Sequence, residues 1–248
     1  MAVLTAIPVA GLPEVRDGDD LAELIAAADG KIGDEDIVVV AHKVVSKAEG
    51  RVVALHSVQP GAQARELAAQ TGKDPRHVQA ILDETAILVR AERGVIISRT
   101  RHGFVCANAG VDGSNAAPGT LVLLPADPDG SARALRARLR ELTGRNPAIL
   151  ITDSFGRAWR NGQQEVAIGC AGLAVLDDWR GRADGGGRSL TATCIAIADQ
   201  VASAADLVRA KDSREPVVIV GGLARHVSAD DGPGARELVR APSEDLFS

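Results

Sequence analysis

Oxygen donors and guanidinium groups follow an apolar run in the segment ITDSFGRAWRNGQQEVAIGCAG, residues 151–172. The apolar residues 148–151 predict a buried strand, and Asp153 and Ser154 come directly after it. Enzymes with α/β architecture commonly present polar groups to a ligand at such a strand end. Carboxylate and hydroxyl oxygens suit a hard divalent cation, and the arginines that follow suit phosphate or carboxylate. The alternative is an Asp-Ser turn with solvated arginines.

A second group of polar donors lies in residues 108–115, Asn-Ala-Gly-Val-Asp-Gly-Ser-Asn, behind another predicted strand. Glycines on both sides of Asp112 allow close backbone approach, and Ser114 and Asn115 add donors and acceptors. An Asx-rich connecting turn is the alternative for this segment taken alone. Two strand ends that each carry an aspartate favour a shared metal site.

Cationic side chains that could hold an anion lie in two further places. Lys43 and Lys47 follow residues 37–41, which predict a buried strand, and a lysine there can act as a point-charge partner for phosphate. Ordinary solvated lysines are the alternative. Three arginines flank a glycine run at 185–187, and they predict either an anion-binding flap or a charged loop.

Several well-defined catalytic motifs are absent from the sequence. The chain has no phosphate-binding Gly-x-x-x-x-Gly-Lys-Ser/Thr loop, no Gly-x-Ser-x-Gly elbow and no His-Glu-x-x-His. Its five histidines are scattered along the chain, which argues against a histidine-rich metal site. Any metal would therefore be held by oxygen, which indicates magnesium, manganese or calcium.

The composition excludes some classes of function. Hydrophobic residues make up 46% of the 248 residues but aromatic residues only 2%, so the core must be aliphatic. Because aromatic platforms are nearly missing and the net charge is -5, nucleic-acid binding is not expected. We expect a single domain over residues 1–248, which could contain two intimate subdomains.

Cysteine usage and the absence of apolar runs indicate a cytoplasmic protein. Cys106, Cys170 and Cys194 are widely spaced in apolar contexts, and we predict that all three are reduced and buried. No segment has the pattern of a signal peptide or the length of a membrane span, so no membrane contact is expected.

Strand and helix patterns interleave, and several strands adjoin without a helix between them. This pattern predicts an α+β or mixed α/β fold rather than a doubly wound sheet. Predicted strands cover residues 3–9, 37–41, 94–99, 103–107, 121–124, 148–153 and 217–220, with an apolar run at 166–176. Predicted helices cover residues 21–28, 62–70, 75–89, 131–142 and 190–209, whereas residues 44–50 stay ambiguous.

These pieces together resemble the coenzyme F420-0:γ-glutamyl ligase family, and the likeness extends over nearly the whole chain. The motifs that carry it are long, ordered blocks, which makes the resemblance specific. They are IPVAGLP at 7–13, VVSKAEGR at 44–51, NAGVDGSN at 108–115, LPADPDGS at 124–131, ITDSFGR at 151–157, WRNG at 159–162, AIG at 167–169 and the residues Arg180, Gly181, Asp184, Gly187, Arg188 and Leu190.

The resemblance implies a ligase-like fold with mixed sheets, an intertwined homodimer and a role in coenzyme F420 biosynthesis. The implied reaction joins L-glutamate to the carboxylate of coenzyme F420-0, followed by γ-linked addition of further glutamate. GTP would activate the carboxylate as an acyl phosphate, and two divalent cations, Mg²⁺ or Mn²⁺, would neutralise the anions, with K⁺ as a further candidate. The chain would be either a stand-alone enzyme or the N-terminal ligase module of a bifunctional form.

The resemblance also assigns roles to individual residues. Asp112 and Asp153 would be catalytic and hold one cation, and Ser154 would face the second. The residues that would contact GTP are Leu12, Pro13, Glu14, Val15, His42, Lys43, Lys47 and Asn115.

Four positions depart from the family pattern. His42 replaces a small hydroxyl residue, and Gln200 replaces a common glutamate. Lys211 stands where an acidic ligand to the second metal can occur, and Gly221 stands where arginine is usual. Two alternatives therefore stay open: a GTP-dependent amide ligase with another carboxylate acceptor, and an inactive deazaflavin-binding subunit.

Overall fold

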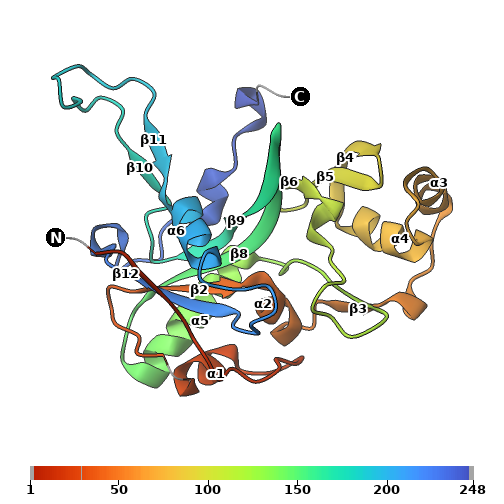
Figure 1. Ribbon diagram of the computed structural model, residues 1–248, viewed down its shortest axis with the longest axis horizontal. Helices are drawn as coiled ribbons and strands as arrows, with labels where there is room; N and C mark the ends of the chain where they lie inside the picture. Colours follow the sequence, from red (N-terminus) through yellow and green to blue (C-terminus); the bar gives the residue numbers. More distant parts are fainter. Residues whose placement is uncertain (1–2, 29, 246–248) are drawn as a thin grey trace.

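A five-stranded mixed sheet forms the centre of the protein in a computed structural model that describes residues 3–28 and 30–245 (Figure 1). Its order is β1-β12-β2-β8-β9, in which β2 and β8 run parallel and the other neighbours run antiparallel. The strands are β1 (Thr5–Pro8), β12 (Val217–Gly221), β2 (Ile37–Ala41), β8 (Ala148–Arg157) and β9 (Arg160–Ala171). The predicted mixed α+β fold class is confirmed.

The central strands are apolar on both faces because helices cover both sides of the sheet. Ile37 and Val39 of β2 point to a core that includes helix α6, whereas Val38 and Val40 point to a core with α1 and α5. This is the period-2 alternation of a strand. Each buried Val, Ile or Leu contributes about 1.5–3 kcal/mol to folding. The long apolar runs in the sequence therefore become the middle of the sheet.

Helix ends coincide with local capping signals. Asp127 caps α5 by accepting a hydrogen bond from the Gly130 amide, and Gly144 ends that helix at φ +70°. The prediction for residues 131–142 is therefore confirmed, with one further turn at the start. The α-helices are α1 (Leu21–Ala27), α2 (His42–Ala48), α3 (Ala62–Thr71), α4 (Pro75–Glu84), α5 (Pro128–Thr143) and α6 (Ile197–Asp206).

A smaller lobe packs beside the sheet around its own apolar core, at the right of Figure 1. Helices α3 and α4 cover a three-stranded antiparallel sheet of β4 (Thr85–Glu92), β5 (Val95–Thr100) and β6 (Val105–Ala107). Strands β3 (Val52–Ala54) and β7 (Thr120–Val122) pair between this lobe and the main sheet. Short 3₁₀ turns lie at Leu55–Ser57, Asn108–Gly110, Ala224–His226, Ala235–Leu238 and Pro242–Glu244.

A β-hairpin arm projects from the body, built by β10 (Leu176–Asp178) and β11 (Cys194–Ala196). The predicted helix over residues 190–209 is wrong in its first part, because residues 194–196 pair with β10 and the helix begins only at Ile197. Long-range strand pairing outweighs the helix propensity of the alanines there. The prediction that all three cysteines are buried is also wrong, since Cys194 is exposed on this arm.

Two further predicted segments change type in the structure. The helix predicted over residues 75–89 stops at Glu84, and residues from Thr85 onward pair with β5. Of the ambiguous residues 44–50, those up to Ala48 belong to helix α2, which begins at His42 and follows β2 without a loop, and the last two form the turn after it. No helix among the described residues is both long and apolar enough to cross a lipid bilayer.

Gly169 provides a direct test of how α5 packs on the sheet. A Cβ atom at this position of β9 would lie 2.3 Å from the Pro128 carbonyl oxygen at the start of α5. We expect Gly169→Ala to lower the free energy of unfolding in urea by about 1–3 kcal/mol, because the helix start must move. Gly185→Ala is the matched control, since its added methyl group meets nothing within 4 Å. Equal stability of the two variants would contradict this packing.

Candidate functional site

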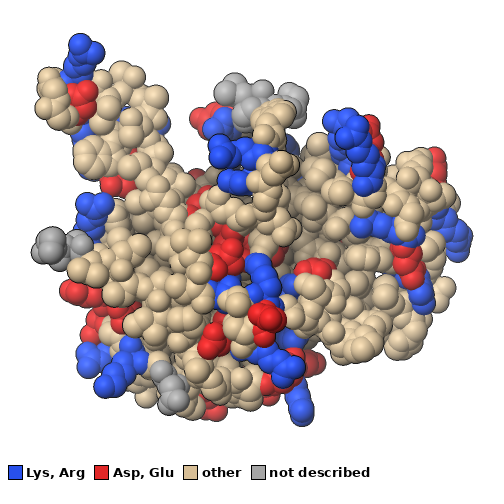
Figure 2. Space-filling model, in the orientation of Figure 1, with Lys and Arg blue, Asp and Glu red and all other residues tan. Residues whose placement is uncertain are grey.

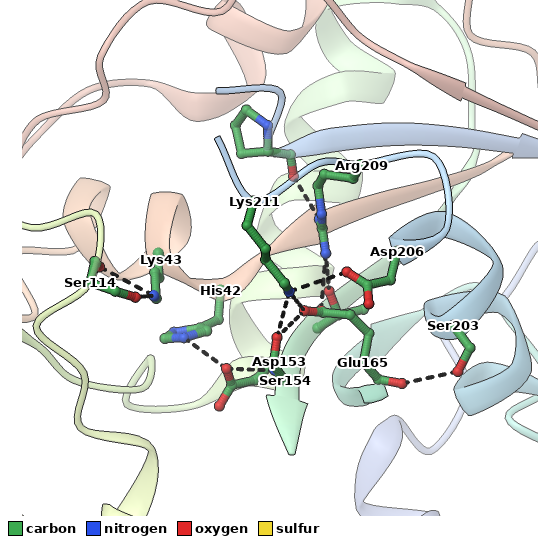
Figure 3. Close-up of polar contacts among 12 residues, drawn as sticks. His42, Lys43, Ser114, Asp153, Ser154, Glu165, Ser203, Asp206, Arg209 and Lys211 are labelled. Carbon is green, nitrogen blue, oxygen red and sulfur yellow. Dashed lines mark hydrogen bonds and ion pairs between the residues drawn. The ribbon is translucent and has the colours of Figure 1, made fainter. Parts of the chain in front are cut away.

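The parallel pairing of β2 and β8 brings His42 and Asp153 to the same edge of the sheet. Ala41 and Thr152 are register partners, so His42 and Asp153 come next at the point where β2 ends, while β8 continues in its pairing with β9. His42 Nε2 lies 3.2 Å from Asp153 Oδ1, and the ring is buried with Nδ1 3.4 Å from Ser46 Oγ (Figure 3). The imidazole thus lies against the carboxylate, although the contact is not aligned as a hydrogen bond.

Asp153 keeps one oxygen available. Its Oδ1 is approached by His42 and also accepts a hydrogen bond from the Ser154 amide at 2.8 Å. Among the described residues, no group donates to Oδ2. A half-buried carboxylate with one uncommitted oxygen can still ligate a cation or accept a proton.

The loop that carries Asp112 begins with three consecutive left-handed residues. Asn108, Ala109 and Gly110 have φ values of +54°, +52° and +73°. Two of them carry a Cβ atom, and such conformations cost about 1–3 kcal/mol each unless the surroundings enforce them. The buried Asn108 Oδ1 has no hydrogen-bond partner among the described residues. Strain and an unpaired acceptor concentrate where the loop turns toward Asp112.

Lys43 holds this loop to helix α2. Its Nζ lies 2.5 Å from Asp112 Oδ2 and 2.5 Å from Ser114 Oγ. Burial alone would raise the pKa of the Asp112 carboxyl, but the Lys43 ammonium together with the Ser114 hydroxyl and amide lowers this pKa to about 2. Because His42 and Lys43 are adjacent, one dipeptide contacts both aspartates that the sequence singled out.

Cys106 lies in β6, just before the loop that carries Asp112, and near Asp153. It does not act as a reactive thiol. Burial, together with the nearby charge of Asp153, raises the pKa of Cys106 to about 12. A thiol with this pKa is protonated at neutral pH and is a poor nucleophile. Cys106 therefore belongs to the wall of the site.

A second polar cluster lies on the other side of Asp153, around Ser154 (Figure 3). The β8–β9 hairpin makes Ser154 and Glu165 register partners, and Ser154 Oγ donates to Glu165 Oε1 at 2.5 Å. Arg209 Nη2 lies 3.0 Å from Glu165 Oε2. Burial would raise the pKa of Glu165, but Arg209 and the hydroxyls of Ser154 and Thr152, with Lys211, lower it overall.

Lys211 completes this second cluster from the segment between α6 and β12. Its Nζ lies 2.9 Å from Ser154 Oγ, 3.3 Å from Glu165 Oε1 and 3.2 Å from Asp206 Oδ1. Acidic and basic side chains interleave in the centre of the same face in Figure 2. Asp206 belongs to the last turn of α6.

The segment at residues 12–15 meets helix α2 through Lys47. Lys47 Nζ lies 2.5 Å from the exposed Glu14 Oε1, while Val15 is buried in the core. Lys43 and Lys47 are four residues apart, so both lie on the half-exposed face of α2. Asn115 is exposed beside Ser114 and has a left-handed backbone.

The arginines of both predicted anion sites lie elsewhere. Arg157 and Arg160 are exposed register partners at the far end of the β8–β9 hairpin, where Arg157 donates to the Asn161 carbonyl. On the β10–β11 arm Arg180 pairs with Asp178, and the Arg182 guanidinium lies 5.1 Å above the Trp179 ring. None of these arginines contacts Asp153 in the part of the chain that the structure describes.

The oxygen donors of the site fit one of the two divalent cations that the family resemblance implies better than the other. Asp112 and Asp153 offer carboxylate oxygens, and the uncommitted Oδ2 of Asp153 fits a hard divalent cation. Within residues 3–28 and 30–245 no three His, Cys, Asp or Glu side chains gather closely enough to hold a metal ion alone. Further ligands would have to come from a bound substrate or water. Ser154 fits a cation less well, because its hydroxyl already contacts Glu165 and Lys211.

The sequence interpretation missed Glu165, Asp206 and Arg209. Glu165 directly precedes an apolar run, and a lone acid at the border of a buried strand was the available signal. The pairing register that places it opposite Ser154 depends on the hairpin, and the sequence pattern did not reveal that hairpin. Asp206 is the last residue of α6 and Arg209 lies beyond its end, whereas the predicted helix extended to residue 209.

Comparison with known proteins shows the family to which the chain belongs. Residues 11–222 match the family model described as F420-0:gamma-glutamyl ligase. The chain is 49% identical over 236 residues to the coenzyme F420:L-glutamate ligase of Methanopyrus kandleri, which covers 94% of this chain and 93% of that protein. It is 44% identical to the protein of the same name from Methanothermobacter thermautotrophicus, with 98% of each chain covered. It is 41% identical to that of Archaeoglobus fulgidus, with 97% and 94% covered.

The Lys43–Asp112 pair generates a prediction about acid titration. Since the folded pKa of Asp112 is about 2 and its ordinary value is 3.8, the pair stabilises the fold above about pH 4 and loses this contribution as pH falls to about 2. We expect Lys43→Met to raise the pKa of Asp112, as measured by carboxyl ¹³C NMR on the metal-free protein. Lys31→Met is the control, because Lys31 is exposed and precedes the opposite end of β2. An unchanged Asp112 titration would contradict the pairing.

Proposed function

The chain belongs to the F420-0:γ-glutamyl ligase family, and from this premise we propose that it joins L-glutamate to the carboxylate of coenzyme F420-0 in coenzyme F420 biosynthesis. Family membership confirms the resemblance inferred from the motifs. The observation that carries the proposal is the joining of Asp153 and Asp112 by the His42–Lys43 dipeptide. Relatives with the same name cover nearly the whole chain, which supports the same reaction here.

Amide formation at neutral pH requires activation of the carboxylate, and we propose GTP as the source. The F420-0 carboxylate oxygen attacks the γ-phosphorus, the bond from that phosphorus to the β-phosphate bridging oxygen breaks, and GDP leaves. The glutamate amine then attacks the acyl carbon, and inorganic phosphate leaves with the bonding electrons. The proton of the amine passes to solvent or a base. A γ-linked second addition would repeat the same steps.

Lysines of α2 are suited to hold the phosphates. Lys43 is kept in place by Asp112 and Ser114, so its ammonium needs little reorganisation to meet a phosphoryl oxygen. Lys47 lies one turn further along and contacts Glu14, the exposed residue of the 12–15 segment. We propose that this segment, with His42 and Asn115, borders the nucleotide.

Mg²⁺ or Mn²⁺ held by Asp112 and Asp153 would neutralise the triphosphate that these two acids otherwise repel. The acids would orient the cation, and His42 would keep Asp153 from rotating by its contact with Oδ1. The packed imidazole and the strained 108–110 turn both restrict the two carboxylates before any ligand arrives.

A different carboxylate acceptor finds no support at Gly221. A Cβ atom there would lie 2.8 Å from Thr5 Oγ1 of the paired strand β1, so packing explains the glycine. The inactive deazaflavin-binding alternative also finds no support, because Asp112, Asp153 and Lys47 are all present. Homodimer formation, a K⁺ requirement and a cytoplasmic location stay predictions.

Mass spectrometry of a reaction with F420-0, L-glutamate, GTP and Mn²⁺ tests the proposed reaction. We expect a product heavier by one or two glutamyl units, which is absent without GTP. Unchanged F420-0, with the protein folded and bound to GTP, would contradict the proposed acceptor. Product formation with ATP but not GTP would contradict the proposed phosphoryl donor.

Asp153→Asn tests the site itself. We expect kcat of this variant to fall by about 10²–10³-fold, because a neutral amide replaces the charged carboxylate. Its unfolding midpoint should stay the same, because the amide has the same shape as the carboxylate. Asp178→Asn is the matched control, since that aspartate lies on the arm and pairs with Arg180. Wild-type turnover by Asp153→Asn would remove this carboxylate from the mechanism.

A further inference from the structure

We propose that the Lys211 ammonium takes the place of a second divalent cation at Ser154, so that the protein binds a single divalent cation, at Asp112 and Asp153. The inference rests on the proposed function for the meaning of the first cation. It concerns the cluster of Ser154, Glu165, Asp206 and Lys211 (Figure 3). The disagreement between an expected cation at Ser154 and the ammonium found there motivates it.

The geometry around Lys211 is that of an ammonium with all three donors in use. Its Nζ has three oxygen neighbours, from a hydroxyl and two carboxylates, at 2.9 to 3.3 Å. A hydroxyl and two carboxylates would otherwise suit Mg²⁺ or Mn²⁺, but that ion needs oxygens at about 2.1 Å. The same oxygens are therefore spread around a larger, singly charged cation.

The charges of the cluster already balance. Glu165 and Asp206 supply two negative charges, and Arg209 and Lys211 supply two positive charges. The side chains of Glu165 and Arg209 are only 5% and 8% exposed, so this pair is shielded from salt and water. A divalent cation added here would meet a neutral cluster, and it would have to displace Lys211 from its three acceptors.

The position between Asp112 and Asp153 differs from the Ser154 cluster in having a carboxylate oxygen that no side chain in the described part of the chain occupies. Asp153 Oδ2 has no donor among the described residues, and Lys43 is the one cation that contacts Asp112 there. A cation that enters this position must displace Lys43 from Asp112, but it gains the uncommitted Oδ2 of Asp153 and meets two carboxylates with one lysine. A cation that enters at Ser154 must displace Lys211 from three acceptors in a cluster whose charges already balance. The two positions should therefore differ strongly in affinity for the same ion.

Lys211 is also able to act on a bound anion. The side chain is 67% exposed, although its head is fixed by three contacts. An ammonium on the open side of the cluster attracts a phosphoryl oxygen as a point charge, and it can donate to that oxygen by giving up one of its three present acceptors. In this way one charge of the chain itself performs the neutralising role that the family resemblance gave to a metal.

Counting bound Mn²⁺ tests the inference independently of turnover. The loss of the free-ion EPR signal is titrated on the intact protein, with and without GDP. We expect one Mn²⁺ per wild-type chain and none for Asp112→Asn at the same concentrations. Lys211→Glu should bind two Mn²⁺, because the cluster then carries a net charge of about -2 and offers a third carboxylate.

Control variants separate the local effect from the change in total charge. Lys31→Glu makes the same charge change at an exposed position before the opposite end of β2, and it should keep one Mn²⁺. Lys211→Gln keeps the size of the side chain but removes its charge, and it should gain a second site at least about tenfold weaker than that of Lys211→Glu. This variant answers the question if Lys211→Glu does not fold.

Three results would overturn the inference. They are two Mn²⁺ per wild-type chain, an unchanged count of one in both folded Lys211 variants, and a second ion in Lys31→Glu. The number of bound Mn²⁺ ions does not depend on which carboxylate substrate is joined to glutamate, or on any product being formed. A failed ligation assay together with the expected counts would therefore reject the proposed function and leave the role of Lys211 intact.

Discussion

The parallel pairing of β2 and β8 is the constraint on which the site depends. Both strands are buried on both faces, so neither can slide by a residue without turning its core side chains to the wrong side. This register makes Ala41 and Thr152 partners, and it thereby fixes His42 beside Asp153. Helix α2 begins directly after β2, so Lys43 then reaches the Asp112 loop without an intervening flexible segment. The packing of apolar strands thus determines the placement of the charged groups.

The β8–β9 hairpin imposes a second consequence on the same edge. It sets Glu165 opposite Ser154, and a carboxylate buried there must be paired with cations. Arg209 and Lys211 supply them from a segment that connects α6 to β12. The connection is therefore held against the sheet edge by electrostatic contacts rather than by an apolar core. A segment fixed in this way can release its contacts when a charged ligand competes for them.

Positively charged side chains of the protein contact carboxylates at two positions of the site, Asp112 and Glu165, and the two positions differ in burial and in net charge. Lys43 contacts Asp112 in a half-exposed loop whose backbone is strained, and the neighbouring Asp153 keeps one free oxygen among the described residues. The Glu165 cluster is deeper and neutral. A polyanion with its metal would enter at the first position and meet fixed positive charge at the second. This asymmetry suits the proposed reaction of a carboxylate, a triphosphate and an amino acid, because the repulsion between these anions is reduced before they arrive.

The buried strands, the capped helix α5, the mixed fold class and the candidate polar residues could all be predicted from the amino-acid sequence. Those polar residues are Asp112, Asp153, Lys43 and Lys47. These predictions follow from local patterns of apolar residues, glycine and aspartate, which a single segment contains in full. Three features could be seen only in the folded protein: residues 194–196 form a strand, β4 replaces the end of a predicted helix, and Glu165 faces Ser154. Each of these features depends on pairing with another strand, and the energy of that pairing outweighs the propensity of the segment by itself. The contact between Lys211, just before β12, and Ser154 in β8 depends on the pairing of β12 with β2 and of β2 with β8, so no single stretch of the sequence records it.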